Sequence, residues 1–298
     1  SAKEKIMTKP TILVTGATGK TGALVVDQLL AKGNAVRALV RRRDQRSERL
    51  ASAGADAVVG DLLDIASLRP VMQGIDRAYF VYPPADRLLE ATANFAQVAR
   101  EVGIGAVVNM SQIVAREGHP SPLTRQHWLA ERVLDWAQVG AVHLRPTFFA
   151  EMPFILNGRT IAADGTIYQP HGEGRHAPVA SEDIARVVVA VLANPAPHAG
   201  KTYVVTGPTA MSQRDIAATF GKVLSKPVEY VDLPTAQWQE AMAEAGLPPF
   251  VIEHLSRVAE DHRNGVFDKV TDVVQQITGE PPQSFEAFVR DNAQALAS

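Results

Sequence analysis

Short apolar runs alternate with amphipathic stretches along the first half of the chain. In the stretches between the runs, apolar residues recur at a helical period, as at Leu24, Val25, Leu29 and Leu30. Runs that are apolar throughout and separated by helices are typical of a parallel sheet covered on both faces. The pattern therefore predicts an α/β fold with a doubly wound parallel sheet. Strands are expected at Thr11–Thr15, Ala35–Val40, Asp56–Val59, Arg77–Val81, Ala106–Met110 and Val142–Leu144, and helices at Lys20–Lys32, Gln45–Ala53, Ile65–Gln73, Asp86–Val102 and Pro122–Gln138.

The rhythm changes after Arg145-Pro146. Residues 146–180 are rich in glycine, proline and histidine without a clear period, and they predict long loops. Beyond them we expect a smaller, mostly helical lobe that is interleaved with the sheet. Its expected elements are a helix at Ser181–Ala193, a strand at Thr202–Thr206 that returns to the sheet, a helix from a capping box at Ser212 to Leu224, a short strand at Val228–Val231 and mostly helix from Pro234.

Composition narrows the class of protein. The 298 residues are 46% hydrophobic and 21% charged, which is typical of a globular chain with a substantial core. A formal net charge of −2 gives no electrostatic case for a nucleic-acid or membrane partner. The absence of cysteine excludes disulfides, thiolate nucleophiles and cysteine-bound metals. No apolar run approaches the roughly 18 residues of a membrane span, so a cytoplasmic protein is expected.

One loop carries a candidate binding function. Gly16, Gly19 and Gly22 are spaced three apart between the first predicted strand and the first helix. There the first glycine permits a tight turn, the second lets the backbone approach a pyrophosphate, and the third lets the helix lie close to the sheet. The spacing predicts a dinucleotide cofactor on a Rossmann sheet, with a tight turn that binds nothing as the alternative. The other candidate phosphate contacts of this loop are Thr15, Thr18, Lys20 and Thr21.

The end of the second strand bears on the identity of the cofactor. An acid usually stands there for NAD, and an arginine for NADP. Here the strand runs into Arg41-Arg42-Arg43 with no acid before Asp44. Because a guanidinium can bind a 2′-phosphate bidentately, we expect NADP, held by Arg41 with Arg42 in reserve. The alternative is a solvated basic turn. After the third strand, Asp61 is a candidate acceptor for the adenine amino group, and a turn or helix-cap role is its alternative.

Together with the glycine loop, the runs Gly60-Asp61-Leu62 and Tyr82-Pro83-Pro84 and the tail from Thr278 to Phe288 resemble NmrA-like proteins. These are atypical short-chain dehydrogenases/reductases, and the resemblance covers essentially the whole chain. The family includes NADPH-dependent quinone, azo-dye and triphenylmethane-dye reductases, as well as NADP-binding regulators that do no chemistry. The resemblance implies that Ser111 lies near the substrate carbonyl. It also implies cofactor contacts at Leu62, Tyr82, Pro83, Pro84, Met110, Thr147 and Phe148, with core packing as the alternative for Phe148.

The proton-transfer pair of ordinary short-chain dehydrogenases, Tyr-x-x-x-Lys, is missing. None of the five tyrosines has a lysine four residues later, and no lysine occurs between Lys32 and Lys201. The corresponding helix carries His127 and Glu131, one turn apart on one face. His127 is the candidate group to hydrogen-bond or protonate the acceptor, with Glu131 steadying it. A surface histidine paired with a carboxylate is the alternative, and no metal site is proposed.

The missing pair constrains the reaction. Hydride delivery to a simple ketone builds a basic alkoxide that needs a positioned acid, whereas a quinone yields a stabilised oxygen anion that solvent can protonate. We therefore expect an NADPH-dependent reductase of quinones or similar conjugated aromatic acceptors. A non-catalytic NADP sensor that acts through a protein partner is the competing hypothesis.

The expected organisation follows from this hypothesis. Residues 1–10 form an N-terminal tail in which Met7 is a candidate natural start, residues 11–150 the dinucleotide-binding core and residues 151–298 the substrate lobe. Residues 146–180 are long enough for a substrate lid. We expect Gly165–Gly174 and the helices from Pro248 onward to shape the substrate pocket, and a homo-oligomer is compatible with this reading.

Overall fold

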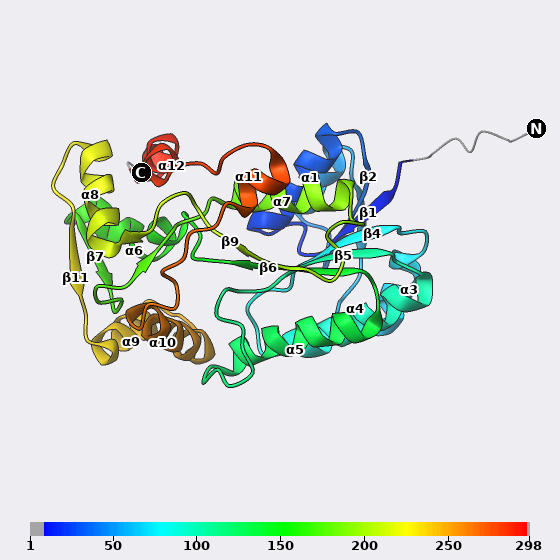
Figure 1. Cartoon of the computed structure of the whole chain (residues 1–298), viewed down its shortest axis with the longest axis horizontal. Helices are drawn as coiled ribbons and strands as arrows, with labels where there is room; N and C mark the ends of the chain where they lie inside the picture. Colours follow the sequence, from blue (N-terminus) through cyan, green and yellow to red (C-terminus); the bar gives the residue numbers. More distant parts are fainter. Residues whose placement is uncertain (1–8, 297–298) are drawn as a thin grey trace, which may run out of the picture.

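A computed structural model describes residues 9–296; residues 1–8 of the predicted tail, with Met7, lie outside this range. A seven-stranded sheet forms the centre, and every neighbouring pair of its strands is parallel (Figure 1). This architecture confirms the predicted Rossmann-type α/β fold. In spatial order the strands are β3 (Asp56–Val59), β2 (Ala35–Val40), β1 (Thr11–Val14), β4 (Arg77–Phe80), β5 (Ala106–Met110), β6 (Ala141–Pro146) and β9 (Thr202–Val205).

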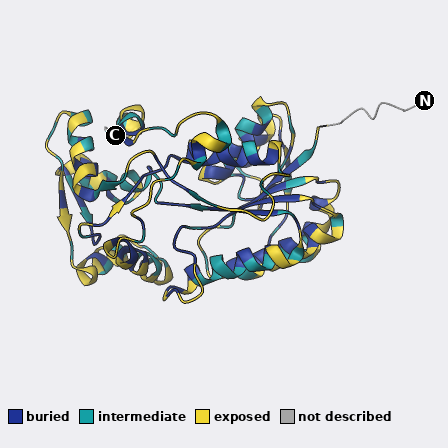
Figure 2. Cartoon of the chain, in the orientation of Figure 1, coloured by how far each residue is buried: buried dark blue, intermediate teal, exposed yellow. Residues whose placement is uncertain are grey.

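Helices cover both faces of the sheet, whose strands are largely buried (Figure 2). Successive strand residues point to opposite faces, so Ile12 and Val14 join one apolar cluster and Leu13 joins the other. One face carries α1 (Lys20–Ala31), α7 (Ser181–Ala193) and α11 (Val273–Thr278), and the other carries α3 (Ile65–Met72), α4 (Leu88–Val102) and α5 (Pro122–Ala137) (Figure 1). A short helix, α2 (Gln45–Ser52), connects β2 to β3.

The second half of the chain adds the expected, mostly helical lobe, which the chain enters after the carboxyl ends of β6 and β9. Two small sheets pair β7 with β11 and β8 with β10. The elements are α6 (Met152–Ala163), β7 (Thr166–Gln169), β8 (Arg175–His176), β10 (Met211–Ser212), α8 (Gln213–Leu224), β11 (Glu229–Asp232), α9 (Thr235–Glu244), α10 (Pro249–Arg263), α12 (Phe285–Asn292) and the 3-10 helix η1 (Ala293–Leu296).

The prediction of long loops over residues 146–180 is wrong, because α6, β7 and β8 lie there. Helix α6 buries only Asn157 and Ile161, so its sequence carries no apolar stripe at helical period. Of the glycines and prolines that indicated loops, Pro153 lies in the first turn of α6, Gly165 directly precedes β7 and Pro170 directly follows it.

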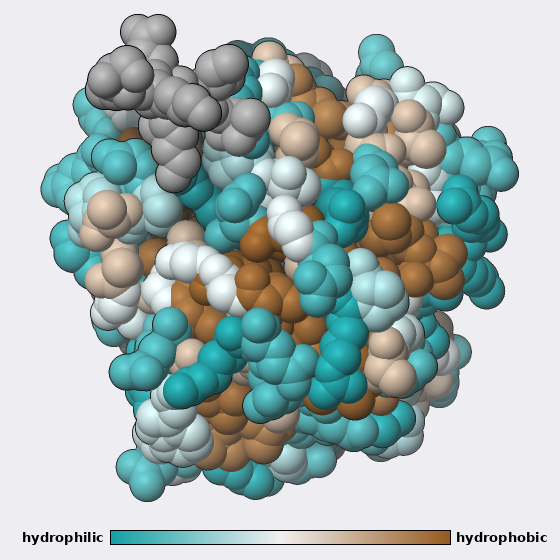
Figure 3. Space-filling model, turned by 90° about the vertical axis from the view of Figure 1, so that its right-hand side faces the viewer, coloured by the Kyte–Doolittle hydropathy of each residue, from teal (hydrophilic) through white to brown (hydrophobic). Residues whose placement is uncertain are grey.

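The surface opposite the lobe shows separate apolar patches among polar side chains (Figure 3). Between residues 9 and 296, no helix has the length and apolar character needed to cross a bilayer.

Candidate functional site

The glycine loop lies between the carboxyl ends of β1 and β4, where the strand order reverses. In open α/β sheets, ligands bind at this crevice. Gly16 has a φ of +55°, which favours glycine, and a Cβ there would approach Val81 Cγ1 to 2.7 Å. A Cβ on Gly22 would collide with the Gly16 carbonyl oxygen. The loop can therefore close against α1 only with glycine at these two positions.

Gly19 caps the start of α1 and is exposed. No side chain caps this helix, and the N–H groups of a first helical turn have no partners within the helix. Donor groups and the positive end of the helix dipole thus face the same open space, an arrangement that suits a phosphate.

Two hydroxyls of the loop form hydrogen bonds to the end of β4. Thr15 Oγ1 donates to the Val81 carbonyl oxygen and accepts from the Val81 N–H, both at 2.9 Å, which joins β1 to the end of β4. Thr21 Oγ1 lies 2.8 Å from the hydroxyl of the buried Tyr79. The candidates nearer the surface are Thr18, which is half-buried, and Lys20, which is exposed.

Arg41 is exposed just beyond the end of β2. The acid that follows it, Asp44, accepts hydrogen bonds from the Arg46 and Ser47 N–H groups at 3.0 Å and so caps α2. These bonds, with that from Ser47 the strongest influence, hold the pKa of Asp44 below its usual range. Arg42 approaches the same carboxylate at 3.8 Å, whereas Arg41, directly after the strand, is exposed to solvent.

The ends of β3 and β4 bring Asp61 and Tyr82 near Arg41. Burial raises the pKa of Tyr82, the negative charge of Asp61 adds to the rise, and Arg41 opposes it. Asp61 Oδ1 accepts from the Leu63 N–H at 2.9 Å, so the turn role given as its alternative is present. The other candidates here are Leu62, which is buried in the core, and Pro83 and Pro84, which are exposed.

A buried ion pair stands near the position of the missing Tyr-Lys pair. Glu131, on α5, has 0% of its surface exposed and binds the guanidinium of Arg145, on β6, at 2.9 and 2.6 Å. Ser111, directly after β5, donates its hydroxyl proton to the same carboxylate at 2.6 Å. Glu131 therefore holds Ser111 and Arg145, and it does not pair with His127 as expected.

His127 instead lies near His254 of α10. Burial, and to a smaller extent the charge of His254, lowers the pKa of His127 to about 3. Burial likewise lowers the pKa of His254 to about 4, and its Nδ1 lies 2.9 Å from Ser121 Oγ. At neutral pH both rings are uncharged, so His127 can form a hydrogen bond but holds no imidazolium proton to give away. Among residues 9–296, no three histidine or acidic side chains are arranged to hold a metal ion.

Thr147 directly follows β6, whose Leu144 pairs with Met110 at the end of β5. Its N–H donates to the Val205 carbonyl oxygen at 3.1 Å. Its Oγ1 is buried and has no hydrogen-bond partner in the described part of the chain. A buried hydroxyl normally has a hydrogen-bond partner, which a ligand or an ordered water can provide.

The next residue, Phe148, points into the lobe. Its ring stacks on Phe267 with 4.7 Å between centroids and lies 5.4 Å from His171. Core packing, the alternative for Phe148, is thus present, and one part of the ring also borders a small cavity.

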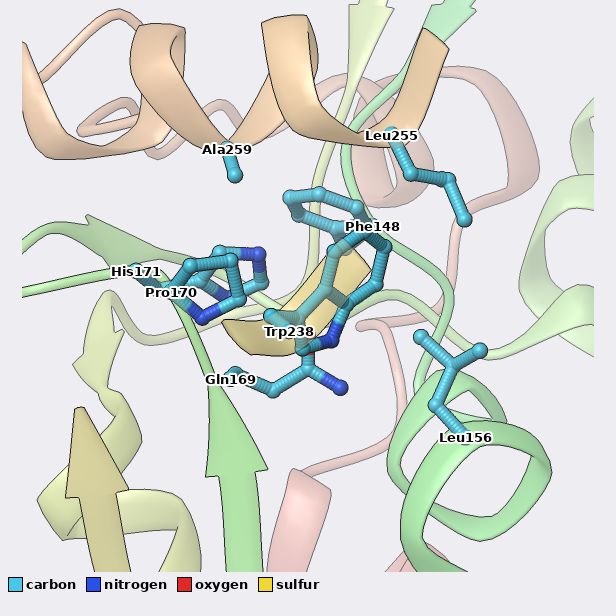
Figure 4. Close-up of a pocket in the computed structure, with 8 residues that line it drawn as sticks. All are labelled: Phe148, Leu156, Gln169, Pro170, His171, Trp238, Leu255 and Ala259. Carbon is cyan, nitrogen blue, oxygen red and sulfur yellow. The ribbon is translucent and has the colours of Figure 1, made fainter. Parts of the chain in front are cut away.

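That cavity has a volume of about 10 Å³ and lies between α6, α9, α10 and the end of β7 (Figure 4). Segments that we expected to shape the substrate pocket, Gly165–Gly174 and the helices after Pro248, meet here. Apolar groups form most of the wall and polar groups stand at its edge. The lining side chains are Phe148, Leu156, Pro170, Leu255 and Ala259, with Gln169, His171 and Trp238.

A model of the NmrA-like family matches residues 8–289. The chain belongs to the NmrA-like family. This assignment confirms the resemblance inferred from the glycine loop, the Pro-Pro turn and the tail.

Two relatives and one solved structure illustrate the likeness. The NAD(P)H azoreductase of Xenophilus azovorans is 29% identical over 289 residues, covering 96% of this chain and 99% of the relative. Quinone oxidoreductase 2 of Escherichia coli is 25% identical over 275 residues, covering 91% and 94%. The fold is also that of the Citrobacter sp. triphenylmethane reductase complexed with NADP(H), with a TM-score of 0.84, 24% identity and coverage of 94% and 99%.

Sequence reasoning missed two features of this NmrA-like site. The first is the Glu131–Arg145 ion pair, whose members are separated by a helix end and a strand. The second is Trp238, which lines the cavity from α9. A single aromatic residue in a short helix was the available signal, because tryptophan is on average highly buried.

Proposed function

We propose that this NmrA-like protein is an NADPH-dependent reductase of quinones or similar electron-poor conjugated acceptors. Relatives named as an azoreductase and a quinone oxidoreductase support an NAD(P)H-dependent oxidoreductase. Preference for NADPH over NADH rests on Arg41, an exposed guanidinium at the end of β2 whose neighbouring acid is occupied in capping α2.

The residues at the sheet edge fit a dinucleotide. Gly19 is exposed at the uncapped start of α1, which suits a pyrophosphate, and Gly16 and Gly22 hold the loop against the helix start. Arg41 suits the 2′-phosphate, and the unpartnered Thr147 hydroxyl suits the amide of the nicotinamide end. When bound, NADPH supplies the hydride.

The proposed class of acceptor rests on one observation: the hydroxyl proton of Ser111 is already used in a hydrogen bond to Glu131. The Ser111 hydroxyl donates to Glu131, and Arg145 keeps that carboxylate paired. His127 is neutral at physiological pH, since burial holds its pKa at about 3. Neither candidate is a ready acid, so the site suits an acceptor whose reduced oxygen is a weak base. For a quinone, one hydride and one proton from solvent give the hydroquinone.

The test is a panel of acceptors with purified protein and NADPH: a quinone, an azo dye and a simple aliphatic ketone. We expect saturable NADPH oxidation with the quinone or the dye and none above background with the ketone. If the ketone is reduced equally well, a proton donor operates that this account lacks. If NADPH binds firmly and no acceptor oxidises it, the sensor hypothesis replaces the reductase.

A further inference from the structure

Helix α9 is attached to the protein by one buried side chain and by a hydrogen bond from Gln239 Nε2 to Ser256 Oγ of α10, at 3.0 Å. Of its residues Thr235–Glu244, only Trp238 is buried, and 1% of its surface is exposed. A helix with so little buried apolar surface opens at a lower free-energy cost than the elements of the core. The side chain that holds α9 in place is also the one that lines the cavity (Figure 4).

The indole Nε1 of Trp238 is buried and has no hydrogen-bond partner among residues 9–296. A buried tryptophan N–H almost always finds an acceptor, because indole nitrogen can only donate. The cavity that Trp238 lines is the space from which an acceptor atom would reach this N–H.

The cavity wall selects for an uncharged ligand. Leu156, Leu255 and the ring of Phe148 supply apolar surface, and none of the described side chains that line it is acidic, lysine or arginine. His171 at its edge accepts a hydrogen bond at Nδ1 from Gln213 Nε2, at 3.1 Å, which fixes that ring nitrogen as unprotonated. An anionic group such as a phosphate or carboxylate would find no counter-charge here.

We propose that the pocket beneath α9 binds the flat, uncharged part of the electron acceptor, and that Trp238 Nε1 donates a hydrogen bond to one of its carbonyl oxygens. The proposal rests on the proposed function and names Trp238 as a specificity-determining residue. Phe148 links the two regions, since it lines the pocket and directly follows Thr147 at the cofactor end. The cavity of about 10 Å³ holds roughly one water, so α9 must lift to admit an aromatic ring.

Equilibrium binding separates this role from catalysis. Calorimetric titrations of the full chain saturated with NADP⁺ would compare menadione, a quinone, with 2-methylnaphthalene, a hydrocarbon of similar shape without oxygens. The variant is Trp238→Phe, which removes the N–H and keeps an aromatic ring. The control is Trp136→Phe, a tryptophan on α5 that is 69% exposed.

We expect Trp238→Phe to weaken menadione binding about tenfold, because its carbonyl oxygen loses its donor in a dry site. Binding of 2-methylnaphthalene should change by less than about twofold, since the apolar wall remains. Trp136→Phe should alter neither.

Equal weakening of both ligands would overturn the proposal and leave Trp238 a packing residue whose N–H meets a trapped water. No binding of menadione to the wild type, or unchanged menadione binding in the variant, would also overturn it. NADPH oxidation by the wild type is measured separately. If the wild type oxidises NADPH but Trp238→Phe binds menadione as tightly as the wild type, only the role of Trp238 is refuted. If the ligands bind as expected but NADPH is not oxidised, only the reductase is refuted.

Discussion

Acidification from about pH 7.5 to about pH 5.5 is expected to destabilise the fold through its buried histidines. His262 is the clearest of them. It is fully buried, its Nε2 accepts from His176 Nδ1 at 2.9 Å, and its ring stacks on His171 with 4.4 Å between centroids. Burial lowers its pKa to about 4. Protonation of His262 would turn two ring N–H groups toward each other in a dry site.

The sign and size of the effect follow from proton linkage. An unfolded histidine has a pKa of about 6.5, so between pH 6.5 and 4 the unfolded chain binds a proton that folded His262 does not. The free energy of unfolding therefore falls as the pH falls through this window. At about pH 5.5, tenfold more of the unfolded chain is protonated than neutral, which corresponds to a loss of about 1 kcal/mol from this one residue.

Urea unfolding followed by circular dichroism at a series of pH values measures this loss. His262→Gln removes the titrating ring, so its stability should fall by about 1 kcal/mol less than that of the wild type between about pH 7.5 and 5.5. His198→Gln is the comparison: burial also lowers the pKa of His198, but this histidine is more exposed, so its removal should change the pH dependence less than that of His262. If His262→Gln and the wild type lose the same stability, His262 is already charged or solvated in the folded state and the reasoning fails.

Three further substitutions test the site. Arg41→Ala should raise the KM for NADPH at least about tenfold and leave that for NADH nearly unchanged, because a charged hydrogen bond to the 2′-phosphate is lost; Arg42→Ala should act less strongly, since Arg42 lies by Asp44. Gly22→Ala should abolish tight NADP⁺ binding and lower the stability by about 1–3 kcal/mol, as its Cβ would meet backbone. Glu131→Gln should cost about 2–3 kcal/mol in urea unfolding, because Arg145 loses its carboxylate.

Each has a result that contradicts it. If Arg41→Ala raises the KM for NADPH and the KM for NADH equally, Arg41 does not contact the 2′-phosphate. Gly118→Ala is the control, because a Cβ there meets open space, and it should change neither NADP⁺ binding nor stability. If Gly22→Ala also changes neither, the loop is not tightly closed. Glu117→Gln is the exposed control for Glu131→Gln, and matching stabilities of the two variants would mean that the buried ion pair contributes nothing.

The Rossmann half could be predicted because its signals are local. Two of the apolar runs form β1 and β4. The spacing of the glycines predicted the close approach of α1 to the loop, which the structure shows between Gly16 and Gly22. The lobe was harder, because its elements are short and stabilised by distant partners. Helix α6 contacts the lobe through Phe154, Leu156, Asn157 and Ile161, and because its apolar residues Phe154–Leu156 are consecutive, they do not show a helical period.

The candidate site divides in the same way. The candidate cofactor contacts could be predicted because residues such as Arg41 lie directly after strands. Two contacts could not be foreseen, because they join residues far apart in the chain: Ser111 reaches Glu131 across 20 positions, and His127 meets His254 of α10. Trp238 was invisible for the same reason, since its cavity is assembled from four separate segments.

The central claim is that NADPH bound at the glycine loop reduces a conjugated acceptor. The most direct measurement mixes the protein–NADPH complex, in molar excess over added quinone and without oxygen, with menadione in a stopped-flow spectrometer and follows the loss of nicotinamide absorbance. The account predicts one NADPH oxidised for each menadione reduced, with a rate that saturates as the complex is raised and that depends on Arg41. Bound NADPH that stays reduced over many minutes, or oxidation that is no faster than without protein, would contradict it.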